Sequence, residues 1–207
     1  MKNKEVRAFT FEVRADEVDG KNIITGRPIV YESETDLGEF REVIEEGALE
    51  GTDLKDVPFF VNHNIDMIPL ARSRNNNENS TLQMKVDEKG MAIRTELDVE
   101  RNADAKALYS ATERGDIDGM SFMFGRVIDE WEDLDTDRPL RKIKKIEKVY
   151  EVSAVTFPAY EETSLETAGA RSKAEVLESA KATLESVRAK EARKAELINK
   201  LKEIRKG

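Results

Sequence analysis

The chain has 207 residues, of which 39% are hydrophobic, and this suits one globular domain with an appendage. It holds no cysteine, which excludes disulfides, thiolate nucleophiles and cysteine-bound zinc, and predicts a reducing cytoplasm as its setting. The net charge is −9, yet residues 171–207 hold 11 Lys and Arg against 6 Glu, so an acidic body precedes a basic tail. Because an acidic body repels phosphate, we expect no specific nucleic-acid partner.

The first 60 residues are typical of short strands in a meander, because apolar and β-branched residues cluster at 6–13 and 23–31 with glycines around them. Residues 40–51 carry apolar side chains at helical spacing and end on glycine, which predicts a short helical turn. A further strand is expected at 59–61, and it ends just before His63.

Two apolar runs in the middle of the chain, at 82–86 and 91–93, alternate as a half-buried hairpin does. The most clearly marked helix of the body follows them. Asn102 is a suitable N-cap for a helix through residues 103–111, and Gly115 stands where a terminal glycine ends a helix.

Residues 120–124 and 149–157 are strongly apolar, and we expect both to be core strands. The loop between them begins like a calcium-binding loop. However, Arg138 replaces the required glycine and Lys144 stands where the bidentate glutamate belongs, so we expect only a charged loop and no metal.

The tail at 172–207 lacks proline, is rich in Ala, Glu, Lys and Leu, and carries an imperfect heptad stripe. This predicts a long helix, joined to the body by a linker at 161–170. A solvated charged helix and a helix that contacts protein are both compatible with this composition. No window approaches the roughly 20 apolar residues of a membrane helix, and the N-terminus lacks the apolar stretch of a signal peptide, so we expect a soluble chain with no membrane partner.

His63 is the single histidine, so any mechanism that needs an imidazole base near neutral pH must use it. It follows an apolar strand, which is a rigid support for a catalytic group. Ser121 lies in the segment GDIDGMSFMFG, where small glycines allow a substrate backbone to approach closely. Each residue alone is also compatible with a purely structural role. His63 would then be an ordinary surface or core histidine, and Ser121 would hydrogen bond a backbone group.

Four segments together resemble a known family, and they occur in the family's order. The segments are FREVIEEGAL at 40–49, FFVNHNIDMIPLARS at 59–73, RGDIDGMSFMF at 114–124 and VYEVSAVTFPAYEET at 149–163. They look like the caudovirus prohead serine protease family, the HK97-type capsid maturation proteases, over about three quarters of the chain.

The resemblance implies a fold shared with the herpesvirus assemblins, and a mechanism with His63 as general base and Ser121 as nucleophile. For the third group, which orients the imidazole, we favour Glu151, because an acidic residue in this strand is similar to the family pattern. Glu147 is the runner-up, and a merely solvated Glu151 is the plain alternative. We expect the oxyanion hole to use backbone amides of the turn that follows 157–159.

We therefore expect a mainly β (α+β) fold, an assemblin-like antiparallel β-barrel with flanking helices over residues 1–163, and a linker with a charged helical tail at 164–207. The implied function is that of a serine endopeptidase, without cofactor, that cleaves the scaffold portion of the major capsid protein, or a separate scaffold, during phage head maturation. The resemblance and the heptad stripe together also suggest the hypothesis that the enzyme removes its own tail. The alternative is a catalytically inactive, protease-like scaffold protein that nucleates prohead assembly. Either would act in the host cytoplasm inside the prohead, with capsid protein and copies of itself as partners.

Overall fold

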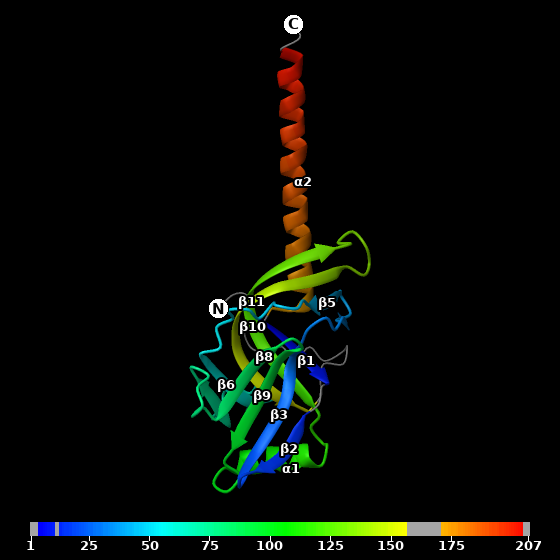
Figure 1. The fold of residues 1–207 in the computed structure, drawn as a ribbon. Helices are drawn as coiled ribbons and strands as arrows, with labels where there is room; N and C mark the ends of the chain where they lie inside the picture. Colours follow the sequence, from blue (N-terminus) through cyan, green and yellow to red (C-terminus); the bar gives the residue numbers. More distant parts are fainter. Residues whose placement is uncertain (1–3, 11–12, 157–170, 205–207) are drawn as a thin grey trace.

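The computed structural model describes residues 4–10, 13–156 and 171–204, and the side chains of these except at 9, 10 and 199–204. The described chain is mainly β, with two helices, of which the C-terminal one is long and projects from the β body (Figure 1). This confirms the predicted class of fold. Neither helix in these ranges is both long and apolar enough to cross a membrane.

The larger sheet of the described residues holds the strands in the order β1–β10–β11–β5–β4, with β6 beside β11 and β7 beside β6. Its strands are β1 (Lys4–Thr10), β4 (Thr35–Asp36), β5 (Arg41–Ile44), β6 (Asp56–Val61), β7 (Ala71–Arg74), β10 (Gly119–Glu132) and β11 (Leu140–Val155). The long strand β11 runs antiparallel to β10 and parallel to both β5 and β6. It is therefore the strand to which the rest of this sheet is attached.

The smaller sheet is antiparallel throughout and has the order β2–β3–β9–β8. Its strands are β2 (Arg14–Val18), β3 (Lys21–Val30), β8 (Leu82–Asp87) and β9 (Gly90–Leu97). The β8–β9 pair is the hairpin that the alternating pattern predicted. Helix α1 (Ala103–Glu113) follows this sheet, and its cap is also as predicted, because Asn102 Oδ1 accepts hydrogen bonds from the backbone of the first turn.

The expected closed antiparallel barrel is not formed by the backbone ladders of the described residues, which divide into these two sheets. Between β7 and β8 the ladder is replaced by a side chain. The Asn76 side chain donates to the carbonyl oxygen of Met84 at 2.7 Å and accepts from its N–H at 2.8 Å. The polar loop that separates the two strands thus joins the sheets with an amide side chain instead of paired backbones.

The helical turn predicted for residues 40–51 is wrong in its first part, which is strand β5. Glu42 and Ile44 are buried while Arg41 and Val43 are half-buried, which is the two-residue period of a strand. The pattern is hidden in the sequence because Glu42 is a charged residue on the buried face. Turns do follow at 46–51.

The main core fills the space between the two sheets, with Phe59, Phe122 and Phe124 among its largest fully buried side chains. Because side chains alternate along a strand, residues 121, 123 and 153 lie on the other face of the larger sheet. The core therefore supports, from behind, the face on which the candidate site lies.

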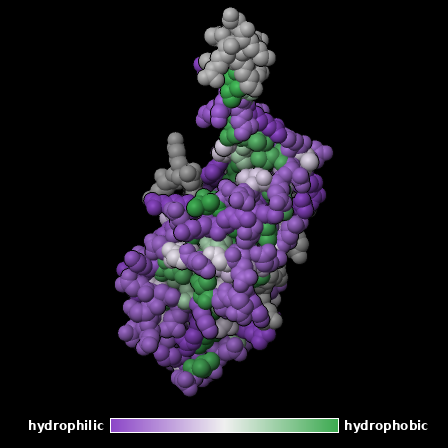
Figure 2. Space-filling model, turned by 45° about the horizontal axis from the view of Figure 1, so that its top comes forward, coloured by the Kyte–Doolittle hydropathy of each residue, from purple (hydrophilic) through white to green (hydrophobic). Residues whose placement is uncertain are grey.

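Helix α2 (Lys173–Ile204) is attached to the body over its first half, as far as Arg188, whose guanidinium pairs with Asp135 in the loop between β10 and β11. Val176 and Leu177 are buried in a small apolar cluster whose other members are Leu37, Phe40, Trp131 and Leu134. Further along, Val187, Leu197 and Ile198 are exposed, and Figure 2 shows hydrophobic surface along the projecting helix, interrupted by hydrophilic side chains. The predicted linker at 161–170, and with it the domain boundary after residue 163, falls outside the described residues.

The turn of the β8–β9 hairpin requires glycine at position 90. Gly90 has a φ of 123°, and a Cβ there would lie 2.1 Å from the carbonyl oxygen of Ile29. We predict that Gly90→Ala lowers the free energy of unfolding by about 3 kcal/mol, because strain and overpacking add. Gly20→Ala is the matched control, since its φ is 71° and its Cβ would meet no described atom within 4 Å.

Urea denaturation of both variants measures the difference. The control carries only the backbone penalty, about 1 kcal/mol. Equal losses in the two variants would show that the close approach of Ile29 to Gly90 is not a constraint on this fold.

Candidate active site

His63 lies in the tight turn that follows β6, and the backbone there is unusual. Asn62 and His63 have φ values of 49° and 55°, in the left-handed region that asparagine tolerates better than most residues. Asn62 fixes this turn to the end of β11: its Oδ1 accepts from the Thr156 N–H at 3.0 Å, and its Nδ2 donates to Thr156 Oγ1 at 3.1 Å. The turn that carries the imidazole is therefore fastened to the central strand.

Glu151 and Ser153 are two residues apart on β11 and point to the face of the sheet that carries His63. His63 Nδ1 is hydrogen bonded to Glu151 Oε1. Ser153 Oγ donates to Glu151 Oε2 at 2.6 Å and accepts from the His63 backbone N–H at 3.2 Å. His63 is 8% exposed, Glu151 2% and Ser153 0%, so these interactions are shielded from solvent.

Ser121 lies on β10 directly opposite Ser153 in the antiparallel ladder. Side chains opposite each other in such a ladder have Cβ atoms about 5 Å apart on the same face. Ser121 is therefore a neighbour of the His63–Glu151 pair. Its hydroxyl donates to the carbonyl oxygen of Arg7 at 2.7 Å, on the far side of β10, and the side chain is fully buried. In this state the hydroxyl proton is directed away from the imidazole.

The structure thus brings His63 and Glu151 into contact and places Ser121 beside them, but it does not bring Glu147 to this site. Glu147 is exposed on β11, where its backbone carbonyl accepts from the Asp53 N–H at 2.8 Å. Among the two carboxylates considered from the sequence, Glu151 is the one that contacts the imidazole. The turn predicted to supply the oxyanion hole, after 157–159, lies outside the described residues.

Sequence reasoning missed two residues of this site, Asn62 and Ser153. A signal for Ser153 was present, because residues two apart on a strand share a face and Glu151 was already a candidate. Asn62 is an asparagine next to the single histidine, but nothing local shows that Thr156 is its partner, since the contact spans 94 positions in the sequence.

Arg7 connects Ser121 to a buried charged cluster on the opposite face of the sheet. Its carbonyl oxygen accepts from Ser121, whereas its guanidinium donates to Glu42 Oε1 at 2.6 Å and to Glu5 Oε2 at 2.9 Å. Burial alone would lower the pKa of Arg7, but Glu42 and Glu5 outweigh burial and raise it above its ordinary value. The strand that supplies the acceptor for Ser121 is therefore held by buried ion pairs.

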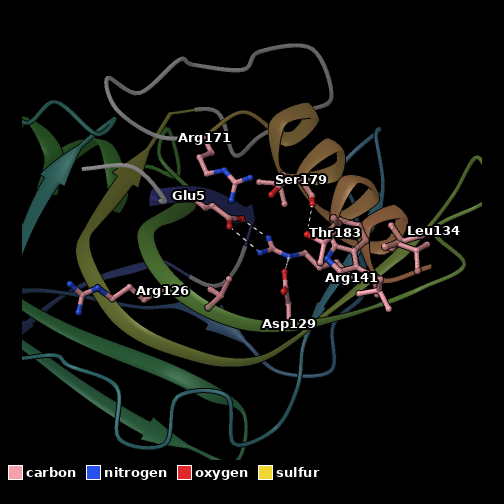
Figure 3. Close-up of a pocket in the computed structure, with 14 residues that line it drawn as sticks. Glu5, Arg126, Asp129, Leu134, Arg141, Arg171, Ser179 and Thr183 are labelled. Atoms are coloured by element: carbon pink, nitrogen blue, oxygen red, sulfur yellow. Dashed lines mark hydrogen bonds and ion pairs between the residues drawn. The ribbon is translucent and has the colours of Figure 1, made fainter. Parts of the chain in front are cut away.

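A cavity of about 460 Å³ lies between this cluster, the β10–β11 hairpin and α2 (Figure 3). Arg141, Glu5 and Asp129 line its wall, and Ser179 faces it from α2. Burial would lower the pKa of Arg141, but its hydrogen bond with Glu5 and the nearby carboxylates raise it. Arg141 is paired with both Glu5 and Asp129, and the predicted catalytic residues are not among the described lining residues.

The chemistry of the His63 site follows from its hydrogen bonds. A carboxylate on Nδ1 holds a proton there and leaves the lone pair of Nε2 as the basic one, and this is how serine hydrolases arrange their acid and base. Among the residues that the structure describes, no three His, Asp or Glu side chains gather as metal ligands. A buried serine beside such a pair is the arrangement on which the class of serine hydrolases relies.

Comparison with protein families narrows this class. The model of the caudovirus prohead serine protease family matches residues 9–179. The chain belongs to this family, which confirms the resemblance seen in the sequence and implies a part in phage head maturation. Comparison with curated proteins and with solved structures gave no match.

The Asn62–Thr156 pair generates a prediction about stability. We expect Asn62→Ala to lower the free energy of unfolding by about 1 kcal/mol more than Asn75→Ala does, because two hydrogen bonds to Thr156 are lost. Asn75 is the matched control, since it is an exposed asparagine with a φ of 60°. Chemical denaturation of both variants gives the difference. Equal losses would mean that the penalty comes from the left-handed backbone alone.

Proposed function

We propose that the chain is an active serine endopeptidase that cleaves the scaffold portion of the major capsid protein, or a separate scaffold protein, during phage head maturation. The observation that carries this proposal is the buried hydrogen bond between His63 Nδ1 and Glu151 Oε1, next to Ser121. A buried carboxylate on Nδ1 can orient the imidazole and stabilise its protonated form during catalysis. Family membership supports the same activity.

In the proposed mechanism His63 acts through Nε2, because Nδ1 is bonded to Glu151. Ser121 Oγ attacks the carbonyl carbon of the scissile peptide while its proton passes to Nε2. The imidazolium, stabilised by Glu151, then gives the proton to the leaving amine, and the C–N bond breaks. Water attacks the resulting ester with the same base, which releases the acid product and restores the Ser121 hydroxyl.

Attack requires a local change at Ser121. Its hydroxyl donates to the Arg7 carbonyl, so it must rotate about its Cα–Cβ bond towards His63 before the proton can be transferred. The lost hydrogen bond costs about 1 kcal/mol, which is small beside the barrier of peptide hydrolysis. We propose that substrate binding triggers this rotation, after which Ser121 Oγ donates directly to His63 Nε2 while it faces the scissile carbonyl.

The family implies that the substrate is found in the prohead, and we propose that the chain acts there, within the host cytoplasm. Helix α2 fits a docking function among scaffold helices, because its part beyond Arg188 projects from the body and carries exposed Leu197 and Ile198 (Figure 1). We further propose that the enzyme removes this tail by cleaving itself, and that copies of the chain associate while they do so.

The second candidate function is an inactive, protease-like scaffold that nucleates prohead assembly. The observation in its favour is the state of Ser121, which is fully buried and donates to Arg7. Labelling of assembled proheads with a fluorophosphonate separates the two candidates. A label on Ser121, located by mass spectrometry, supports the endopeptidase, and no label on any serine supports the scaffold.

Replacing the nucleophile gives the direct test of the endopeptidase. We predict that coexpression of the chain with its capsid protein yields truncated capsid subunits, and that Ser121→Ala leaves them at full length with proheads still assembled. Ser121→Ala should also keep the C-terminal tail that the unsubstituted chain loses. Intact-mass spectrometry of both proteins measures these outcomes.

Truncated capsid subunits in the Ser121→Ala coexpression would contradict the assignment of the nucleophile. An identical, intact C-terminus in both forms of the protease would exclude self-removal of the tail while leaving capsid cleavage untouched.

The acid of the proposed triad is tested by neutralising it. We predict that Glu151→Gln lowers the rate of capsid cleavage on the order of 10⁴-fold, because the amide cannot stabilise the imidazolium. Glu147→Gln, an exposed change on the same strand, should keep the rate within about twofold, since surface substitutions have small effects. A time course of capsid processing compares them. A large loss in Glu147→Gln alone would reassign the acid.

A further inference from the structure

We infer that Ser153 is a positioning residue for the hydrolysis, one that locks the carboxylate of Glu151 and the turn of His63 into a single arrangement. The inference rests on the proposed endopeptidase function and extends it. Ser153 does not touch the reacting atoms in this mechanism. Its effect passes through the two residues that do the chemistry.

The hydroxyl of Ser153 makes both of the interactions that a hydroxyl needs to be satisfied in a buried position. It donates to Glu151 Oε2 at 2.6 Å and accepts from the His63 N–H at 3.2 Å. Together with the bond between Glu151 Oε1 and His63 Nδ1, this closes a ring of three hydrogen bonds. The ring fixes the imidazole relative to both its own backbone and its carboxylate partner.

Because the ring is buried, breaking any of its hydrogen bonds is costly in free energy. Ser153 is 0% exposed and Glu151 is 2% exposed, so a broken bond would leave a carboxylate oxygen and a backbone N–H without a compensating partner. A carboxylate with one oxygen held by Ser153 presents the other oxygen to the imidazole in one direction only. The buried backbone N–H of His63 donates to the same hydroxyl.

The direction of its hydrogen bond distinguishes Ser153 from a nucleophile. The Ser153 hydroxyl donates its hydrogen bond to the carboxylate of Glu151, the strongest acceptor in the site. The Ser121 hydroxyl donates to the neutral carbonyl oxygen of Arg7. The two serines face each other across the β10–β11 ladder, so they share a site with separate tasks. We therefore assign attack to Ser121 and alignment of the base to Ser153.

The inference predicts a loss in turnover without a loss in binding. We expect Ser153→Ala to lower kcat for a peptide spanning the capsid cleavage site on the order of 10- to 100-fold, with KM within about twofold, because a misaligned base slows proton transfer. Ser73→Ala is the matched control. Ser73 is also fully buried and accepts from the backbone N–H of Asn76 at 3.0 Å, but it lies on β7. The Ser73→Ala variant should lose stability and keep the kcat of the unsubstituted chain.

A second measurement does not depend on activity. His63 is the single histidine, so a low-field proton resonance of an imidazole bonded to a carboxylate can be assigned to it without ambiguity. We expect this Nδ1–H resonance in the unsubstituted chain and in Ser73→Ala, and its loss or broadening in Ser153→Ala. Ser153→Cys, which keeps a weak donor and acceptor of similar size, should restore part of both the resonance and kcat.

The outcomes separate the inference from the function on which it rests. An unchanged resonance and unchanged kcat in Ser153→Ala would overturn the positioning role. Equal losses of kcat in Ser153→Ala and Ser73→Ala would also overturn it, because general destabilisation would then explain the result. No peptide cleavage by the unsubstituted chain, with a resonance that still depends on Ser153, would overturn the proposed function instead.

Discussion

The register between β10 and β11 is the constraint on which the candidate site depends. It sets Ser121 opposite Ser153 and Met123 opposite Glu151, so that the serine and the carboxylate share one face of the sheet. The parallel pairing of β6 with β11 then brings the turn of His63 to that face. A slip of one residue would move the polar side chains into the apolar core behind the sheet, and this is why the register is strongly specified.

The two faces of this sheet carry buried polar groups of different kinds. On one face His63, Glu151 and Ser153 form a hydrogen-bonded ring. On the other face Arg7 belongs to a cluster of buried ion pairs, and its backbone is at the same time the acceptor for Ser121. Removing one member of a buried ion pair is strongly destabilising, so this cluster fixes β1 and the resting position of the serine together.

The β body carries the candidate site, and helix α2 extends from this body. Val176 and Leu177 hold its first turns against the body, and most of its later residues are exposed. Arg188 still pairs with Asp135, but beyond it the described part of the helix is exposed and has little tertiary packing to stabilise it. This supports the proposal that its remaining surface serves contacts within the prohead.

Local sequence signals determined the elements whose pattern is complete within a short segment: the β8–β9 hairpin, the cap at Asn102 and the C-terminal helix. They also singled out His63, because it is the only imidazole of the chain. Strand β5 was missed because Glu42 is buried by partners that are distant in the sequence, and the division into two sheets depends on pairings of the same kind. The family resemblance already favoured Glu151 over Glu147, but only the tertiary structure put Glu151 in contact with His63 and added Ser153, since hydrogen bonds between residues 88 and 90 positions apart leave no trace in local periodicity.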